Sequence, residues 1–287
     1  RTAPSPDRFH SSPSTMKLCR FQVPQFDASR LGRSPTETQL AARSGIVDDR
    51  KVIELAGDLL NPRERTGKAF PIDAVQFLAP SVPTKVVCVG RNYAEHAKEL
   101  GNETPKIPLI FLKPPSSVIV PGAPIVMPAI SQRVDFEGEL AVVIGRRCSH
   151  LPDEEDAAPY ILGYTCLNDV TARDIQRADV QFTRGKGFDT FCPFGPVIET
   201  HLDASGVTVE TFVNGVRKQS GHTSEMMFSV DVILRFISRV MTLEPGDVIA
   251  TGTPAGVGPL AAGDVVEVSV SGIGTLRNPV ISEADAR

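Results

Sequence analysis

The sequence lacks the features that mark several large classes of protein. Its 287 residues carry a formal net charge of −4, so it offers no strongly basic field for nucleic acid or for an anionic membrane surface. No apolar run approaches the roughly 18 residues that a membrane-spanning helix requires. A hydrophobic content of 41% is sufficient for a large core, and we therefore expect small-molecule partners, with no nucleic acid and no membrane.

Cysteine is scarce and shows no motif. The cysteines are odd in number and widely spaced, and they form no Cys-x-x-Cys pair, which argues against a zinc site and against a disulfide framework. No apolar signal-peptide core lies near the N-terminus. We therefore expect a reducing, cytoplasmic location and buried structural thiols.

Nucleotide-binding motifs are also missing. The Gly-x-x-x-x-Gly-Lys-Ser/Thr pattern of a P-loop is absent, and Gly256-Val257-Gly258 is followed by Pro259 where a dinucleotide-binding fold would open a helix. Strands and helices do not alternate regularly, which disfavours a doubly wound fold. Nucleotide cofactors are therefore not expected.

The chain divides into three predicted parts. Residues 1–15 are rich in Pro, Ser and Arg and precede Met16, which predicts a disordered or non-native leader, with a transit peptide as the weaker alternative. Residues 16–80 predict a small β-rich domain, and residues 81–287 a larger strand-dominated domain. The predicted strands are 18–23, 51–55, 85–89, 109–112, 125–127, 139–144, 161–167, 248–250 and 265–270.

Two local patterns in the larger domain are especially clear. Asn214-Gly215 separates two β-forming runs, and both residues tolerate the positive φ of a type I′ turn, so the spacing predicts a hairpin. Apolar residues from Val230 to Met241 recur at helical spacing behind Ser229, which is a favourable N-cap. This segment is predicted to be an amphipathic helix packed on the sheet.

Acidic residues interrupt the apolar strands at two places. Glu137 and Glu139 are two positions apart, so a strand projects both to the same side, where their repulsion calls for a cation. Asp169 directly follows another apolar strand. Taken singly, the first pattern is also typical of a solvated strand end and the second of a turn or helix cap. Together, three carboxylates form a hard oxygen site suited to Mg2+ or Mn2+.

Other segments carry candidate catalytic groups. His96 and Glu99 are three residues apart, so a helix would place both on one face and Glu99 could orient the imidazole, although an exposed surface pair has the same spacing. Lys186 lies between two glycines and could stabilise negative charge, while Thr251 or Thr253 could bind a carboxylate. A solvated loop lysine and a simple Gly/Pro turn are the structural alternatives.

Taken in order, these segments resemble the fumarylacetoacetate hydrolase family over about residues 85–276. The motifs are Gly90-Arg91-Asn92-Tyr93 with His96 and Glu99, the Glu137/Glu139 strand, residues 168–174, Gly185 to Asp189, and Thr251 to Pro254. The resemblance implies a mixed, β-rich α/β fold, a β-sandwich or roll with a small N-terminal β-rich domain, and a homodimer.

The resemblance also implies roles for individual residues. Glu137, Glu139 and Asp169 would bind the metal, His96 and Glu99 would activate water on a mobile lid, and Lys186 would stabilise an oxyanion. Substrate binding is assigned to a further set of residues in the matching segments, namely Arg91, Asn92, Tyr93 and Thr253.

The predicted reaction is Mg2+-dependent hydrolysis of a carbon–carbon bond in a 2-oxo or diketo acid of the acylpyruvate or fumarylpyruvate type, with pyruvate enolate as the leaving group. The enzymatic alternatives are isomerisation of a 2-hydroxy-diene dioate, such as 2-hydroxyhepta-2,4-diene-1,7-dioate or 5-carboxymethyl-2-hydroxymuconate, and decarboxylation of oxaloacetate. A noncatalytic relative that binds metal and ligand is the alternative from a different class.

Overall fold

A computed structural model describes residues 16–24, 41–61 and 64–286 of the chain. The predicted leader, residues 1–15, lies outside the described residues. Within them, no helix is long and apolar enough to cross a membrane. All five cysteines are buried and free, as predicted, and burial raises the pKa of each thiol.

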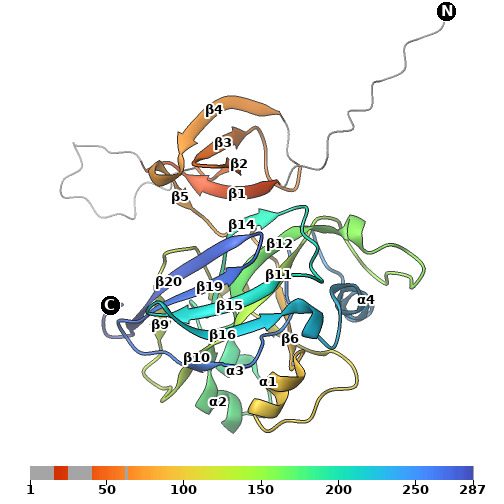
Figure 1. Ribbon diagram of the computed structural model, residues 1–287, viewed down its shortest axis with the longest axis vertical. Helices are drawn as coiled ribbons and strands as arrows, with labels where there is room; N and C mark the ends of the chain where they lie inside the picture. The colour runs from red at the N-terminus through yellow and green to blue at the C-terminus, as the bar shows by residue number, and fades with distance from the viewer. Residues whose placement is uncertain (1–15, 25–40, 62–63, 287) are drawn as a thin grey trace, which may run out of the picture.

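The first part of the chain is an antiparallel β unit. Its strands are β1 (Lys17–Gln22), β2 (Arg43–Asp48), β3 (Lys51–Leu55), β4 (Arg65–Pro71) and β5 (Gln76–Phe77). The tight turn between β2 and β3 places Asp49 at a φ of 51°, a conformation that Asp tolerates better than most residues. Figure 1 shows this unit at one end of the molecule.

The remaining strands form the body of the protein. They are β6 (Val86–Gly90), β7 (Leu109–Lys113), β8 (Val118–Ile119), β9 (Ile125–Met127), β10 (Val134–Phe136), β11 (Gly138–Ile144), β12 (Ile161–Asn168), β13 (Thr171–Ala172), β14 (Cys192–Glu199), β15 (Thr208–Val213), β16 (Val216–His222), β17 (Val248–Ala250), β18 (Gly258–Pro259), β19 (Val265–Val270) and β20 (Gly274–Ser282). The helices are α1 (Ala94–Glu99), α2 (Arg173–Ala178), α3 (Thr183–Lys186) and α4 (Val230–Val240).

The described strands form three sheets. The largest has the order β4-β3-β2-β1-β14-β12-β11-β17-β6-β7, with β5 paired to β1 and β8 to β14. The N-terminal unit therefore joins the main sheet through β1 and β14, where Lys17 pairs with Glu199. A second sheet, β16-β15-β19-β20-β9, packs against it, and a small sheet, β13-β10-β18, lies beside the acidic segment.

The core lies between the sheets and under α4. Residues such as Leu140, Val209 and Val268 fill the space between the two large sheets. On another face, Ile233 and Ile237 of α4 pack against β-strand residues of the main sheet. Burial of these apolar faces is the main force that holds the layers together. The arrangement is the strand-rich sandwich that the sequence predicted.

The local predictions are confirmed. Each predicted strand coincides with an observed strand to within one residue at either end. Asn214 and Gly215 take φ values of 52° and 76° in the β15–β16 turn, and the Ser229 hydroxyl accepts a hydrogen bond from the Val232 N–H at the start of α4. Several observed strands were not predicted, among them β2, β14 and β20, and two of these, β14 and β20, contain proline, which usually argues against a strand interior.

Candidate active site and metal centre

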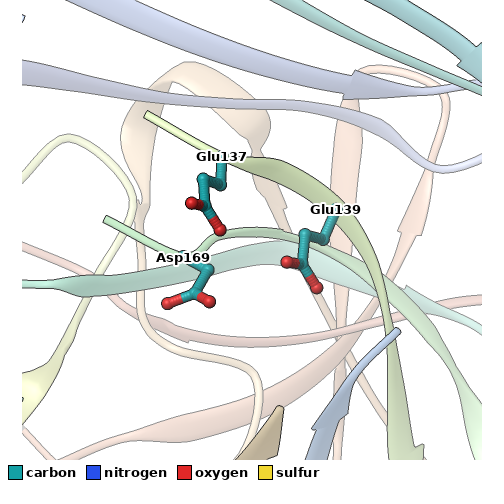
Figure 2. Close-up of side chains that lie close together, drawn as sticks. All are labelled: Glu137, Glu139 and Asp169. Atoms are coloured by element: carbon teal, nitrogen blue, oxygen red, sulfur yellow. The ribbon is translucent and has the colours of Figure 1, made fainter. Parts of the chain in front are cut away.

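Three buried carboxylates converge at the junction of β11 and β12. The antiparallel pairing of Gly138 with Asn168 brings the start of β11 beside the end of β12. Glu137 and Glu139 flank the first residue of this pair, and Asp169 follows the second. One oxygen from each carboxylate lies within 4.8 Å of the others, and Figure 2 shows the three groups around a common space. The predicted clustering of these acids is confirmed.

Each acid is held by a donor of its own. Glu137 Oε1 accepts from Arg173 Nη2 at 2.5 Å, Glu139 Oε2 accepts from the Gly252 N–H at 2.7 Å, and Asp169 Oδ1 accepts from Lys113 Nζ at 2.6 Å. Gly252 has a φ of +104°, a conformation open to glycine and costly for other residues. Each of these contacts uses one oxygen of its carboxylate and so orients the group.

The ammonium group of Lys186 bridges two of the remaining oxygens. Its Nζ lies 2.8 Å from Glu137 Oε2 and 2.7 Å from Asp169 Oδ2. Burial alone would lower the pKa of this lysine, but the charges of Asp169 and Glu137 outweigh it and raise the pKa. Lys186 is a buried residue at the end of α3, so the alternative of a solvated loop lysine does not apply.

The pKa values of the two glutamates are shifted in opposite directions. Burial favours the neutral form of Glu137, yet the positive charges of Lys186 and Arg173 outweigh it and hold the pKa well below the usual range. Burial raises the pKa of Glu139, and the negative charges of Asp169 and Glu137 raise it further. Glu139 is the acid whose ionised form is least compensated by the surrounding protein.

The donor set fits a hard divalent cation. It offers carboxylate oxygens and no imidazole or thiolate, the chemistry that Mg2+ and Mn2+ prefer. A cation at this point would also offset the repulsion that raises the pKa of Glu139. The carboxylates of Glu137, Glu139 and Asp169 are the groups that would hold it.

A cavity of about 200 Å³ opens onto the acids. Of the residues predicted for the site, seven line it: Arg91, His96, Glu137, Glu139, Asp169, Lys186 and Thr253. Four cationic and three acidic side chains are among the lining residues. The site is therefore a small, highly charged pocket beneath α1, α2 and α3, which gather at the end opposite the N-terminal unit (Figure 1).

His96 is a buried base at the wall of this cavity. Burial lowers its pKa below the ordinary 6.5, so the imidazole is neutral at neutral pH. The predicted shared face with Glu99 is present, with Nδ1 3.5 Å from Glu99 Oε2. However, Nδ1 makes no hydrogen bond among the described residues, and the Glu99 carboxylate accepts the Gly256 N–H at 3.0 Å.

Two residues predicted to bind substrate are not brought to the cavity. The Asn92 side chain donates to the carbonyls of Phe228 and Thr251 and accepts the Phe228 N–H, so it ties loops together. Tyr93 is buried, and burial raises its pKa. Thr253 does line the cavity, but its hydroxyl donates to the Gly138 carbonyl.

Several residues of the site were missed by reasoning from the sequence. Arg173 pairs with Glu137 and also with the buried Asp135, at 2.9 Å, and Gln176 and Arg177 follow it on α2 and line the cavity. The sequence feature that could have indicated these three residues is their spacing of three and four positions, typical of one helix face, shortly after Asp169. Lys113 gave no such signal, because one lysine at the end of an apolar strand is usually solvated.

Comparison with known proteins identifies the family. The profile described as fumarylacetoacetate (FAA) hydrolase C-terminal matches residues 85–281, and the one described as Rv2993c-like, N-terminal matches residues 16–80. The chain therefore belongs to the fumarylacetoacetate hydrolase family.

Relatives within this family differ in the names that they carry. An uncharacterised protein of Archaeoglobus fulgidus is 53% identical over 79% of this chain and 90% of its own length. The oxaloacetate tautomerase YisK of Bacillus subtilis is 40% identical over 79% of this chain and 80% of its own. The crystal structure of a 2-hydroxyhepta-2,4-diene-1,7-dioate isomerase from Mycobacterium marinum has a TM-score of 0.81 and 43% identity, covering 93% of this chain and 99% of that one.

Proposed function

We propose that this protein is a Mg2+- or Mn2+-dependent enzyme that moves a proton at the carbon beside the carbonyl of a 2-oxo dicarboxylate and so interconverts its keto and enol forms. The observation that carries the proposal is one buried imidazole on the wall of a cavity that also holds three converging carboxylates. Relatives named as an oxaloacetate tautomerase and a dienedioate isomerase support this reaction class.

Each side chain of the site has a separate role in this reaction. His96, whose pKa is lowered by burial, accepts the proton from the carbon beside the carbonyl and delivers it to the enolate oxygen, which gives the enol. Lys186, whose pKa is raised, and Arg173 supply fixed positive charge beside the oxygen on which negative charge develops. A divalent cation bound by Glu137, Glu139 and Asp169 would supply Lewis-acid stabilisation of the enolate.

The charge of the cavity indicates a substrate with two carboxylates. The acids Glu137 and Asp169 are already compensated by Lys186 and by donors behind them. Arg91 and Arg177 also line the cavity, and the side chain of neither makes a hydrogen bond or ion pair with the described residues. A guanidinium group binds a carboxylate in a bidentate manner, so these arginines would bind the second carboxylate of a 2-oxo dicarboxylate.

Hydrolysis of a diketo acid is the second candidate, and the position of Glu99 favours it. A carboxylate 3.5 Å from His96 Nδ1 needs only a small approach to orient the imidazole for water activation. Under this candidate, His96 would deliver water to the distal carbonyl of an acylpyruvate or fumarylpyruvate. Decarboxylation of oxaloacetate would use the same charge-stabilising groups.

The candidates differ in their products. The full-length protein is incubated with oxaloacetate and with a panel of diketo acids in D2O, with and without Mg2+, and the products are followed by NMR and mass spectrometry. We expect Mg2+-dependent keto–enol conversion and deuterium uptake with no fragmentation. Fragments that have gained water would identify a hydrolase, and loss of carbon dioxide a decarboxylase. Binding without any conversion would contradict an enzymatic role.

Three further features remain predictions for this chain: a homodimer, a cytoplasmic location, and a functional division near residue 80 into a small N-terminal domain and a catalytic domain. Sedimentation equilibrium of the purified chain tests the first, since a monomer across the micromolar range would contradict it.

A further inference from the structure

Lys113 is a buried cation behind the metal centre. It is the last residue of β7 and is 0% exposed. Its Nζ donates to Asp169 Oδ1 at 2.6 Å and to the Val170 carbonyl at 3.0 Å. Lys113 does not line the cavity, so it lies behind Asp169, out of reach of a substrate.

Asp169 therefore contacts two lysines in different positions. Its Oδ1 faces the enclosed Lys113, and its Oδ2 faces Lys186, which lines the cavity and is shared with Glu137. If Lys186 were the only cation paired with Asp169, moving its ammonium group to a substrate would leave the Asp169 carboxylate without a positive charge beside it. Because Lys113 supplies a second, permanent positive charge, Lys186 can turn to a substrate oxygen without leaving Asp169 uncompensated.

We propose that Lys113 is a positioning residue of the metal centre. It fixes the carboxylate of Asp169 through Oδ1, so that Asp169 would serve as a ligand of a divalent cation and Lys186 would be available to the substrate. This inference rests on the proposed metal-dependent function and assigns to one residue the orientation of one ligand. Groups behind a metal ligand commonly set its orientation and charge in this way.

The other two acids support this interpretation. Glu137 is held by Arg173 through Oε1, whereas Lys186 contacts its Oε2, and Glu139 is held by the Gly252 N–H through Oε2. Arg173 lines the cavity and can also contact a substrate. Among the residues that the structure describes, the Lys113 side chain has only the Asp169 carboxylate and the Val170 carbonyl as hydrogen-bond partners, so its effect on metal binding can be measured separately.

The chain contains a matched control for a purely structural role. Lys85 pairs with the fully buried Asp247 at 2.5 Å, and neither residue lines the cavity. Removing either lysine charge takes an ammonium partner away from a buried aspartate, which is destabilising in both cases. Only the Lys113 pair includes a proposed metal ligand.

The test is a Mn2+ titration of the full chain, read by the EPR signal of free Mn2+, with thermal melting in parallel. We expect Lys113→Met to bind Mn2+ about 10- to 100-fold more weakly than the wild type. Lys113→Arg should recover part of that loss, and Lys85→Met should melt earlier but bind Mn2+ like the wild type. If Lys113→Met is recovered unfolded, Lys113→Gln, which keeps a donor for Val170, replaces it.

Three results would overturn the inference. These are wild-type Mn2+ affinity in a folded Lys113→Met, an equal loss of affinity in Lys85→Met, or no recovery with Lys113→Arg. The titration contains no substrate, so it is independent of turnover. A wild-type protein that binds Mn2+ but converts no 2-oxo acid would contradict the proposed function and leave the role of Lys113 standing. A wild-type protein that binds no Mn2+ would overturn both.

Discussion

Two cavities of the described structure differ in volume and in how their acidic side chains are solvated and paired. The one at the metal centre has a volume of about 200 Å³, and the other, which is lined in part by residues of β12 and of the start of α4, about 600 Å³. The larger one also contains three aspartates, Asp156, Asp203 and Asp231, but all three are exposed to solvent. Each cavity therefore contains three acids, and the number of acids does not distinguish the two sites.

What separates them is how the acids are solvated and paired. Asp203 accepts hydrogen bonds from the hydroxyl and N–H of Ser205, which lower its pKa, and Asp231 pairs with Arg235 on α4. Each is an ordinary surface carboxylate. Glu139, by contrast, is buried beside two other acids, and its pKa is raised. Buried like charges without full compensation indicate a site built for a cation.

The sharpest test of this comparison is to neutralise one aspartate in each cavity. Asp169→Asn removes a charged ligand and also leaves Lys113 without its carboxylate, so we expect Mg2+-dependent activity to fall by at least about 10²-fold. Asp203→Asn removes only a turn contact and should leave activity unchanged. Initial rates across a Mg2+ series measure both. Equal activity of the two variants would mean that burial does not distinguish the cavities.

The sequence was sufficient to predict the acid cluster, because its signals are local. Alternation along β11 placed Glu137 and Glu139 on one side, and the end of an apolar strand located Asp169. The same kind of signal gave the β15–β16 turn and α4. Where side-chain period and turn chemistry determine the structure, a single sequence carries enough information.

The compensating charges could not be predicted in the same way. Lys113 reaches Asp169 across 56 positions of sequence, and the side chains of Asn92 and Thr253 are used by loops that only the tertiary structure brings together. No periodicity encodes such contacts. The acids of the centre were therefore visible in the sequence, whereas the groups that orient them became visible only in the structure.

A second test concerns the base of the smaller cavity. We expect His96→Gln to lower kcat by about 10²- to 10⁴-fold, the usual contribution of a general base, with Mn2+ affinity close to that of the wild type. Measurement of kcat and of Mn2+ binding on the same preparation separates the two effects. An unchanged kcat would remove His96 from the mechanism.

The pH dependence follows from the direction of the pKa shift. Burial lowers the pKa of His96 below 6.5, so the basic form persists to lower pH than an ordinary imidazole, and activity should fall only below that value. The unfolded chain binds a proton that the folded chain excludes, so this group also makes stability fall as the pH drops. A wild-type profile with its acid limb above 6.5 would contradict the assignment.

The smallest expected effect concerns the mouth of the same cavity. Arg177 lines the cavity from α2 and is exposed, so its attraction for a carboxylate is partly screened by solvent. We expect Arg177→Met to raise KM for a 2-oxo dicarboxylate about tenfold, the value of one charge-assisted contact, with little change in kcat.

The matched control is Arg184→Met, because Arg184 pairs with Asp179 and lies outside the cavity. A 2-oxo monocarboxylate lacks the group that Arg177 would bind, so its KM should not change. An equal rise for both substrates would instead mean that Arg177 acts on the whole electrostatic field of the cavity.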